Sequence, residues 1–264
     1  MNAKRLFPAV LVIAALLAPA AQGASDYAKE KRWADQIVGS LFVGKAIYLK
    51  ADGHKFLALY TLPQTSKAKG GIIVMHGLGV HPNWADVIYP LRTELPQDGW
   101  YTLSIQMPVL ANGVASDRYG PLLPEADARI GAAIAFLKSK GVHNIVFVCH
   151  SLGNSMAGHF LAHHPGAGVH AWVGVGMSLV PFKDPSLLLT TSLAKIRLPI
   201  LDLYGSQDLK EVLGSVGARA AAAKKAGNTQ YTQLEVKGAD HFFHDKDAIL
   251  MKDVRAWLDK YAVK

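Results

Sequence analysis

The chain has 264 residues, half of them apolar, and its formal net charge of +8 comes from scattered lysines and arginines. The lysines and arginines form no dense run and are not interleaved with aromatic residues. This distribution argues against nucleic-acid binding, so we expect no nucleic-acid partner. The single cysteine, Cys149, excludes an internal disulfide, so the hydrophobic core alone must stabilise the fold.

Residues 1–23 have the pattern of a secretory signal peptide. Lys4 and Arg5 precede an apolar run that is too short to span a bilayer, and small residues at 18–23 offer a cleavage site. Cleavage would remove two cations and no acid, which lowers the charge from +8 to +6. We therefore expect export across the inner membrane to the periplasm or beyond, with no integral membrane span afterwards; an uncleaved anchor is the alternative.

Hydrophobic patterns along the rest of the chain predict a helix over 26–38 and a hairpin of strands 45–50 and 55–62. Strands and helices then alternate. The predicted strands cover 71–75, 100–106, 145–148, 170–177 and 200–204, and a last strand begins at Tyr231 and ends before a glycine turn. The predicted helices cover 83–95, 125–140, 154–163, 186–196, 209–226 and 247–261. This alternation predicts one α/β domain over residues 24–264, with a mostly parallel eight-stranded sheet flanked by helices.

The segment 145–163 reads as a buried strand, a sharp turn with Ser151 at its apex, and a helix. Such a turn exposes the serine hydroxyl and leaves the N–H of Leu152 unpaired at the start of the helix. Gly153 lets strand and helix approach closely, although Cys149 stands where glycine is more common. The segment therefore predicts a nucleophile elbow.

A second glycine-rich turn, His76-Gly77-Leu78-Gly79, directly follows the strand 71–75. It resembles the HGGG-type loop of esterases and lipases, in which a backbone N–H after the His-Gly pair faces the nucleophile. The resemblance implies that the N–H groups of Leu78 and Leu152 together form an oxyanion hole. An ordinary glycine turn between a strand and a helix is the alternative.

An acid and a histidine follow Ser151 in the order that such a site needs. Asp208 comes after the strand 200–204 and a turn at Gly205, and His241 comes after the last strand and another glycine turn. A carboxylate beside His241 would hold its tautomer and stabilise the imidazolium. We predict Ser151 as nucleophile, His241 as general base and acid, and Asp208 as the orienting carboxylate.

Other acids and histidines lie close to these positions. Asp202 is in mid-strand and Asp240 directly precedes His241, but neither ends a strand after a glycine turn. His244 forms an HxxH pair with His241 without a third ligand of matching spacing, so we predict a surface or supporting role for it, no metal site and no cofactor. Two further histidines are interpreted as a helix C-terminal pair favoured by the dipole: His163 and His164.

The serine after the fifth strand, the acid after the seventh and the histidine after the eighth resemble the α/β-hydrolase superfamily over nearly the whole chain. Residues 72–110 are also similar to a bacterial family of secreted predicted hydrolases without an established function. The resemblance implies a secreted serine hydrolase that cleaves carboxylic esters through an acyl-enzyme. Two alternatives remain open: hydrolysis of amides or thioesters on the same residues, and a non-catalytic binding or envelope protein on a hydrolase scaffold.

The predicted rim of the site is short. Cap domains of this fold usually follow the sixth strand, and only residues 178–197 stand there, so we predict no large cap. The segments 80–84 and 109–123 are the other expected rims, and His81 and Trp84 are predicted to contact substrate, with a core position as the alternative for Trp84. An open site suits short-chain or small soluble esters.

Overall fold

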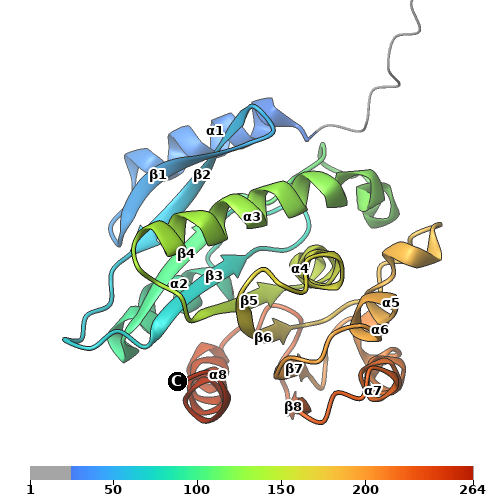
Figure 1. Ribbon diagram of the computed structural model, residues 1–264. Coiled ribbons are helices and arrows are strands. Elements are labelled where there is room, and N and C mark those ends of the chain that lie inside the picture. The colour runs from blue at the N-terminus through green and yellow to red at the C-terminus, as the bar shows by residue number, and fades with distance from the viewer. Residues whose placement is uncertain (1–24, 264) are drawn as a thin grey trace, which may run out of the picture.

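The computed structural model describes residues 25–263, so the predicted signal peptide lies outside the described part of the chain. Its centre is one eight-stranded sheet with the order β1-β2-β4-β3-β5-β6-β7-β8 (Figure 1). The strands are β1 (Lys45–Ala51), β2 (His54–Thr61), β3 (Gly70–Met75), β4 (Trp100–Ile105), β5 (Ile145–His150), β6 (Val169–Val175), β7 (Ile200–Gly205) and β8 (Tyr231–Val236). β2 is antiparallel to β1 and β4, and all other pairs are parallel, which confirms the predicted fold class.

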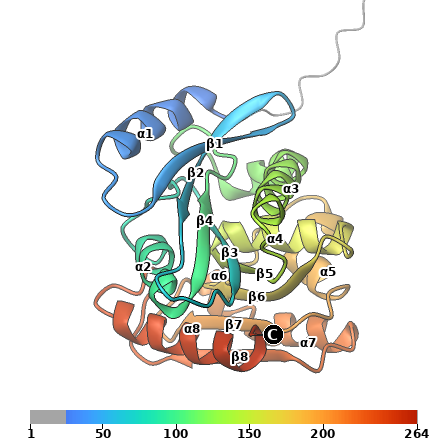
Figure 2. The same ribbon diagram turned by 60° about the vertical axis from the view of Figure 1, so that its left-hand side comes forward.

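Helices cover both faces of this sheet (Figures 1 and 2). They are α1 (Tyr27–Gly39), α2 (Ile88–Glu94), α3 (Leu123–Ser139), α4 (Leu152–His163), α5 (Leu189–Leu193), α6 (Lys210–Leu213), α7 (Val216–Lys225) and α8 (Asp247–Tyr261), with 3₁₀ turns η1 (Leu95–Asp98), η2 (Ser116–Leu122) and η3 (Pro185–Leu187). One hydrophobic core lies under α3, α4 and α5, and a second lies under α2 and α8. Every residue of β3 and β5 is buried because helices cover both faces of these strands, which explains their continuous apolar runs.

The N-terminal helix α1 lies against the β1–β2 hairpin and is tied to α3 by a buried charge cluster. The Asp26 side chain accepts a hydrogen bond from the Lys29 N–H at 2.9 Å and so caps α1. Both carboxylate oxygens of Glu30 accept hydrogen bonds from Arg129, at 2.9 and 3.1 Å. Arg129 also donates to the Gln106 carbonyl at 2.9 Å, which joins α1 to the segment that follows β4.

Three predicted helices are shorter or broken in the structure. The helix predicted over 83–95 begins only at Ile88, because the loop before it places Val87 at a positive φ of 59°. The helix predicted over 186–196 is split into η3 and α5 by an extended Leu188. The helix predicted over 209–226 is broken between α6 and α7, where Gly214 and Ser215 stand.

The remaining predicted elements are confirmed with ends that shift by a few residues, and the last helix occupies the predicted residues 247–261. Between β6 and β7 the chain forms only η3 and the short α5, so the predicted absence of a large cap is confirmed. Among residues 25–263, no helix combines the length and the hydropathy that a bilayer crossing requires. The carboxyl ends of β3, β5, β7 and β8 meet at one edge of the sheet, where the candidate site lies.

Candidate active site

Ser151 stands at the apex of a strained turn between β5 and α4. Its φ of 52° and ψ of −124° lie in a region that residues with a side chain rarely occupy. The surrounding backbone holds it there, because its N–H donates to the Val175 carbonyl at 3.0 Å and its carbonyl accepts from the Asn154 N–H at 2.9 Å. The turn therefore has the geometry of the predicted nucleophile elbow.

Two glycines allow the elbow and the loop after β3 to touch. A Cβ on Gly153 would lie 2.7 Å from the carbonyl oxygens of Met75 and His76, which is too close for any side chain. A Cβ on Gly77 would lie 2.9 Å from the Cβ of Ser151. The backbone of the His-Gly loop therefore packs directly against the serine, as an oxyanion donor would require.

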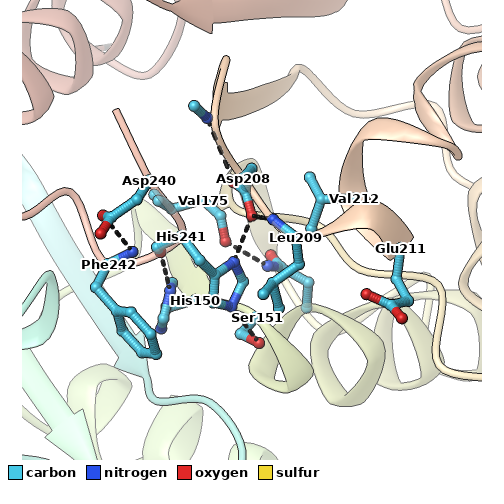
Figure 3. A network of polar contacts seen from close by, with 12 residues as sticks. His150, Ser151, Val175, Asp208, Leu209, Glu211, Val212, Asp240, His241 and Phe242 are labelled. Carbon is cyan, nitrogen blue, oxygen red and sulfur yellow. Dashed lines mark hydrogen bonds and ion pairs between the residues drawn. The ribbon is translucent and has the colours of Figure 1, made fainter. Parts of the chain in front are cut away.

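The structure brings Ser151, His241 and Asp208 together in one hydrogen-bonded chain (Figure 3). The Nε2 atom of His241 lies 2.9 Å from the Ser151 Oγ, and its Nδ1 atom lies 2.6 Å from the Asp208 Oδ1. Because an ionised carboxylate only accepts, Nδ1 carries the proton and Nε2 is left to accept the serine proton. These are the contacts expected of a nucleophile, a base and an orienting acid.

The Asp208 carboxylate is buried and held in place by backbone groups. Its Oδ1 also accepts from the Leu209 N–H at 2.8 Å, and its Oδ2 accepts from the Gly205 N–H at 3.3 Å. The rival Asp202 lies inside β7, where Arg219 binds it with Nε at 2.8 Å and Nη2 at 3.1 Å. Asp202 is therefore part of the interior and does not contact the histidine chain.

The second rival acid, Asp240, forms a local turn after β8. It accepts hydrogen bonds from the N–H groups of Phe242 and His244, at 3.0 and 3.1 Å, and from the His244 ring at 2.7 Å. The ring bond to Asp240 raises the pKa of His244. His244 is more than half exposed and also faces Asp86 at 3.7 Å, in agreement with the predicted surface role.

His76 holds the peptide that precedes Leu78. Its Nδ1 lies 2.9 Å from the Gly77 carbonyl, which only accepts, so the proton is on Nδ1. Its Nε2 accepts from the Met107 N–H at 2.9 Å and from the Gln106 side chain at 3.1 Å. Since the C=O and N–H of one peptide point in opposite directions, anchoring the Gly77 carbonyl turns the Leu78 N–H away from the imidazole.

Burial keeps this imidazole neutral. Desolvation lowers the pKa of His76 from 6.5 to about 3, and the hydrogen bond to Gly77 offsets only part of that effect. A neutral ring can use one nitrogen as donor and the other as acceptor, which is the arrangement seen. The sequence indicates the His-Gly loop but not that Gln106, from the chain after β4, completes its support.

His150, directly before the serine, supports the reactive histidine and was not singled out from the sequence. Its Nε2 lies 2.9 Å from the carbonyl of His241, so this nitrogen is the donor and Nδ1 is unprotonated. Desolvation, with the nearby His241 charge second, lowers its pKa to about 4. The His150 Nδ1 is buried and has no hydrogen-bond partner within residues 25–263. The only sequence signal was its place beside Ser151.

The predicted substrate contacts His81 and Trp84 lie together in the loop after β3. Their rings are 5.6 Å apart, and Trp33 of α1 meets His81 at 5.4 Å. Trp84 packs partly against the core under α2 and α8, which favours the alternative of a core position for it. Contact with substrate remains a prediction for both.

The arrangement can transfer an acyl group. A base in contact with a hydroxyl raises its nucleophilicity, and the N–H of Leu152 begins a helix whose dipole favours negative charge. Cys149 is fully buried in β5, and burial raises the pKa of its thiol well above the ordinary value. It therefore has none of the exposure or thiolate character that a nucleophilic cysteine needs.

Solved structures with the same architecture share little sequence with this chain. Est1E from Butyrivibrio proteoclasticus has a TM-score of 0.65 at 17% identity, over 82% of this chain and 98% of its own. A dienelactone hydrolase from Anabaena variabilis has a TM-score of 0.66 at 19% identity, over 83% and 97%. XC6422 from Xanthomonas campestris, described as an α/β serine hydrolase without lid, has a TM-score of 0.60 at 14% identity, over 84% and 98%. These similarities show the α/β-hydrolase fold.

No protein of curated function matches the sequence of this chain. One family model matches residues 11–121 and 122–260, and so covers almost the whole sequence including the elbow, the acid and the histidine. The chain therefore belongs to the family described as a protein of unknown function, DUF3530.

Proposed function

We propose that this protein is a serine hydrolase that cleaves carboxylic esters through an acyl-enzyme. The observation that carries the proposal is the continuous chain from the Ser151 Oγ through His241 to Asp208, with separations of 2.9 and 2.6 Å. Ser151 has the strained backbone of a nucleophile elbow, and the loop that contains Gly77 packs against it. Chance seldom assembles these features at one sheet edge.

In the proposed mechanism, His241 Nε2 takes the proton of Ser151 as the Oγ attacks the ester carbonyl carbon. The N–H groups of Leu78 and Leu152 stabilise the resulting oxyanion. The carbon–oxygen bond to the alcohol then breaks, and the proton on His241 passes to the leaving oxygen. A water molecule, deprotonated by the same Nε2, attacks the acyl carbon. The bond from this carbon to the Ser151 Oγ then breaks, the proton on His241 returns to Oγ, and the carboxylic acid is released.

Two features favour short-chain or small soluble esters. No large cap follows β6, so long acyl chains would find little enclosing surface. The neighbours of the reactive residues are apolar and partly exposed: Leu78 at 41%, Leu209 at 45% and Phe242 at 36%. Small apolar acyl or alcohol groups would contact these side chains. The dienelactone hydrolase from Anabaena variabilis and an esterase domain from a Rhodothermus marinus protein, both similar in structure, support the same reaction class.

The test is hydrolysis of nitrophenyl acetate and butyrate by the wild type, Ser151→Ala and Ser155→Ala. Ser155 is a matched control because it lies buried on the same helix and its hydroxyl has no hydrogen-bond partner within the described chain. We expect Ser151→Ala to lose about 10⁴- to 10⁶-fold in kcat and Ser155→Ala to retain activity. Full turnover in folded Ser151→Ala would refute the proposal.

The same comparison separates the alternatives. Activity on amides or thioesters but not on oxygen esters, lost in Ser151→Ala, would keep the mechanism and change the substrate class. A folded wild type without activity on any acyl substrate would favour a binding protein on this scaffold.

We also propose that residues 1–23 direct export, as their composition predicts. The intact mass of the protein purified from its native host, with the N-terminal residue identified, tests this. Cleavage within residues 18–24 is expected, and a full-length cytoplasmic product would overturn the proposal.

A further inference from the structure

Three chemistry-bearing side chains gather between α3 and α4, away from the elbow. His159 and His163 are four residues apart on α4, and Asp127 on α3 faces them. One ring nitrogen from each histidine and one carboxylate oxygen all lie within 4.8 Å of one another. Within residues 25–263, this is the one group of three or more His, Cys, Asp or Glu side chains with such spacing.

We propose that Asp127, His159 and His163 form a binding site for a divalent transition-metal ion, with Zn²⁺ as the best fit. Imidazole and carboxylate are the ligands that zinc takes in proteins, at 2.0–2.2 Å. Two ligand atoms around one tetrahedral ion are then roughly 3.3 Å apart. The His159 Nδ1 already lies 2.9 Å from the Asp127 Oδ2. His163 is exposed and its Nδ1 donates to the His159 carbonyl at 2.8 Å, which leaves its Nε2 to bind the ion.

The carboxylate is poorly satisfied without an ion. The Oδ2 of Asp127 accepts from His159 and faces the His164 Nε2 at 3.5 Å, while its Oδ1 is buried without a hydrogen-bond partner in the described part of the chain. Its ion-pair partners among residues 25–263 are both imidazoles, and no Lys or Arg is among them. A buried acceptor without a partner costs free energy that a bound cation would recover.

His164 lies outside the group of three but is the candidate for a fourth ligand, because its Nε2 faces the Asp127 Oδ2 at 3.5 Å. It directly follows α4, and its ring is half exposed, so it can approach an ion held by Asp127. Four protein ligands would close the coordination shell, as in structural zinc sites rather than catalytic ones. A hollow lined by Asp127 and His164 opens to solvent and gives an ion access to the Asp127 side of the cluster.

The site would join α3 to the far end of the helix that carries the elbow. Ser151 precedes α4 and His163 ends it, so about 18 Å of helix separates the two. The ion would therefore stabilise the fold and take no part in ester cleavage, and the proposal does not depend on the proposed function. The spacing of His159 and His163 alone did not reveal the site, because the carboxylate stands 32 positions earlier in the sequence.

The test is isothermal titration of chelator-treated protein with ZnCl₂, together with the thermal midpoint in excess zinc. The variants are His163→Ala and, as the matched control, His143→Ala, an exposed histidine outside the cluster. His163→Ala leaves the Asp127–His159 hydrogen bond in place, so it separates ion binding from a simple tie between helices.

We expect one zinc per chain in the wild type and His143→Ala, with a rise in the thermal midpoint of roughly 5–10 °C at 100 times the Kd. His163→Ala should bind at least about tenfold more weakly and show a smaller rise. Equal binding by all three proteins, or none by the wild type, would overturn the proposal. A fourth protein, His241→Ala, checks the place of the ion. Binding lost in His241→Ala but kept in His163→Ala would place the ion at the Ser151 site and also overturn the proposal.

Discussion

Two buried aspartates that lie close together in the sequence, Asp202 and Asp208, bind different kinds of partner. Asp202 lies within β7 and is saturated: Arg219 binds both of its oxygens, and Tyr231 and Gln233 donate to Oδ2 at 2.5 and 2.9 Å. Asp208 has two backbone N–H donors and directs its strongest contact at His241. The Asp202 carboxylate is paired with a fixed guanidinium and therefore stabilises the interior. The Asp208 carboxylate contacts an imidazole and can stabilise positive charge that develops on His241.

The histidines divide in the same way. Both nitrogens of His76 are occupied by protein groups, so its ring is a support for the loop. His241 uses Nδ1 for Asp208 and presents Nε2 to Ser151. His241 therefore presents one nitrogen to the serine hydroxyl, whereas both nitrogens of His76 are bound by protein groups that hold the His-Gly loop in position.

Asp208→Asn is expected to have the largest effect on activity. The amide can donate to Nδ1 and so impose the wrong tautomer on His241, which is expected to lower kcat about 10⁴-fold. The thermal midpoint should stay near that of the wild type, because the side chain keeps its size. Measured kcat within tenfold of the wild type would contradict the assignment of Asp208.

Asp202→Asn should lower the stability of the fold and leave kcat unchanged. It leaves the buried Arg219 guanidinium without its anion, which is expected to cost about 3–5 kcal/mol of unfolding free energy. The folded fraction should retain the kcat of the wild type. Urea unfolding measures the loss, and Asp35→Asn, an exposed aspartate paired with Lys31, should change stability by less than about 0.5 kcal/mol. A stable Asp202→Asn protein with low kcat would reverse the roles of the two acids.

His76→Phe tests whether the His76 ring positions the loop that carries the predicted oxyanion donor. The phenyl ring fills the same space but releases the Gly77 carbonyl, so the Leu78 N–H would no longer be held in place. A displaced oxyanion donor is expected to lower kcat roughly 10- to 100-fold with little change in KM. Steady-state kinetics test this, and an unchanged kcat in the folded variant would show that His76 only supports packing.

The pH dependence of stability should reflect the supporting histidines. The folded-state pKa is lowered from 6.5 to about 3 for His76 and to about 4 for His150. Between these values and 6.5 the unfolded chain binds more protons, so stability is present above pH 6.5 and is lost as the pH falls.

Each histidine should therefore contribute roughly 2 kcal/mol less at about pH 5 than at neutral pH. Urea unfolding at both values measures this, and His76→Phe should lessen the loss. The same pH dependence in wild type and variant would show that His76 is not buried as a neutral ring.

The strands and the mostly parallel sheet could be predicted because strands such as β3 and β5 are continuous apolar runs between turn residues, a pattern set by burial on both faces. The break in the helix predicted over 209–226 could not, because it depends on a distant partner. Arg219 donates to the Val212 carbonyl at 2.8 Å and to the Ser215 hydroxyl while it binds Asp202. Helical periodicity contains no sign of such a tertiary contact.

The contact between Ser151, His241 and Asp208 could be predicted because each residue stands where a strand ends, and their chain order is a property of the fold. The contacts that support the site and the helices around it could not be predicted. Gln106 reaches His76 across 30 positions, His150 reaches the carbonyl of His241 across 91, and Asp127 meets His159 from another helix. Such pairs become visible only when the strands and helices are placed in space.

An activated Ser151 is the feature on which the proposed function depends most, and fluorophosphonate labelling of the purified protein measures it without a known substrate. Mass spectrometry of the labelled peptide should place the adduct on Ser151 in the wild type, with labelling lost in Ser151→Ala and His241→Ala and retained in Ser155→Ala. No adduct on a well-folded wild type, or equal labelling of His241→Ala, would contradict the central claim that His241 activates this serine.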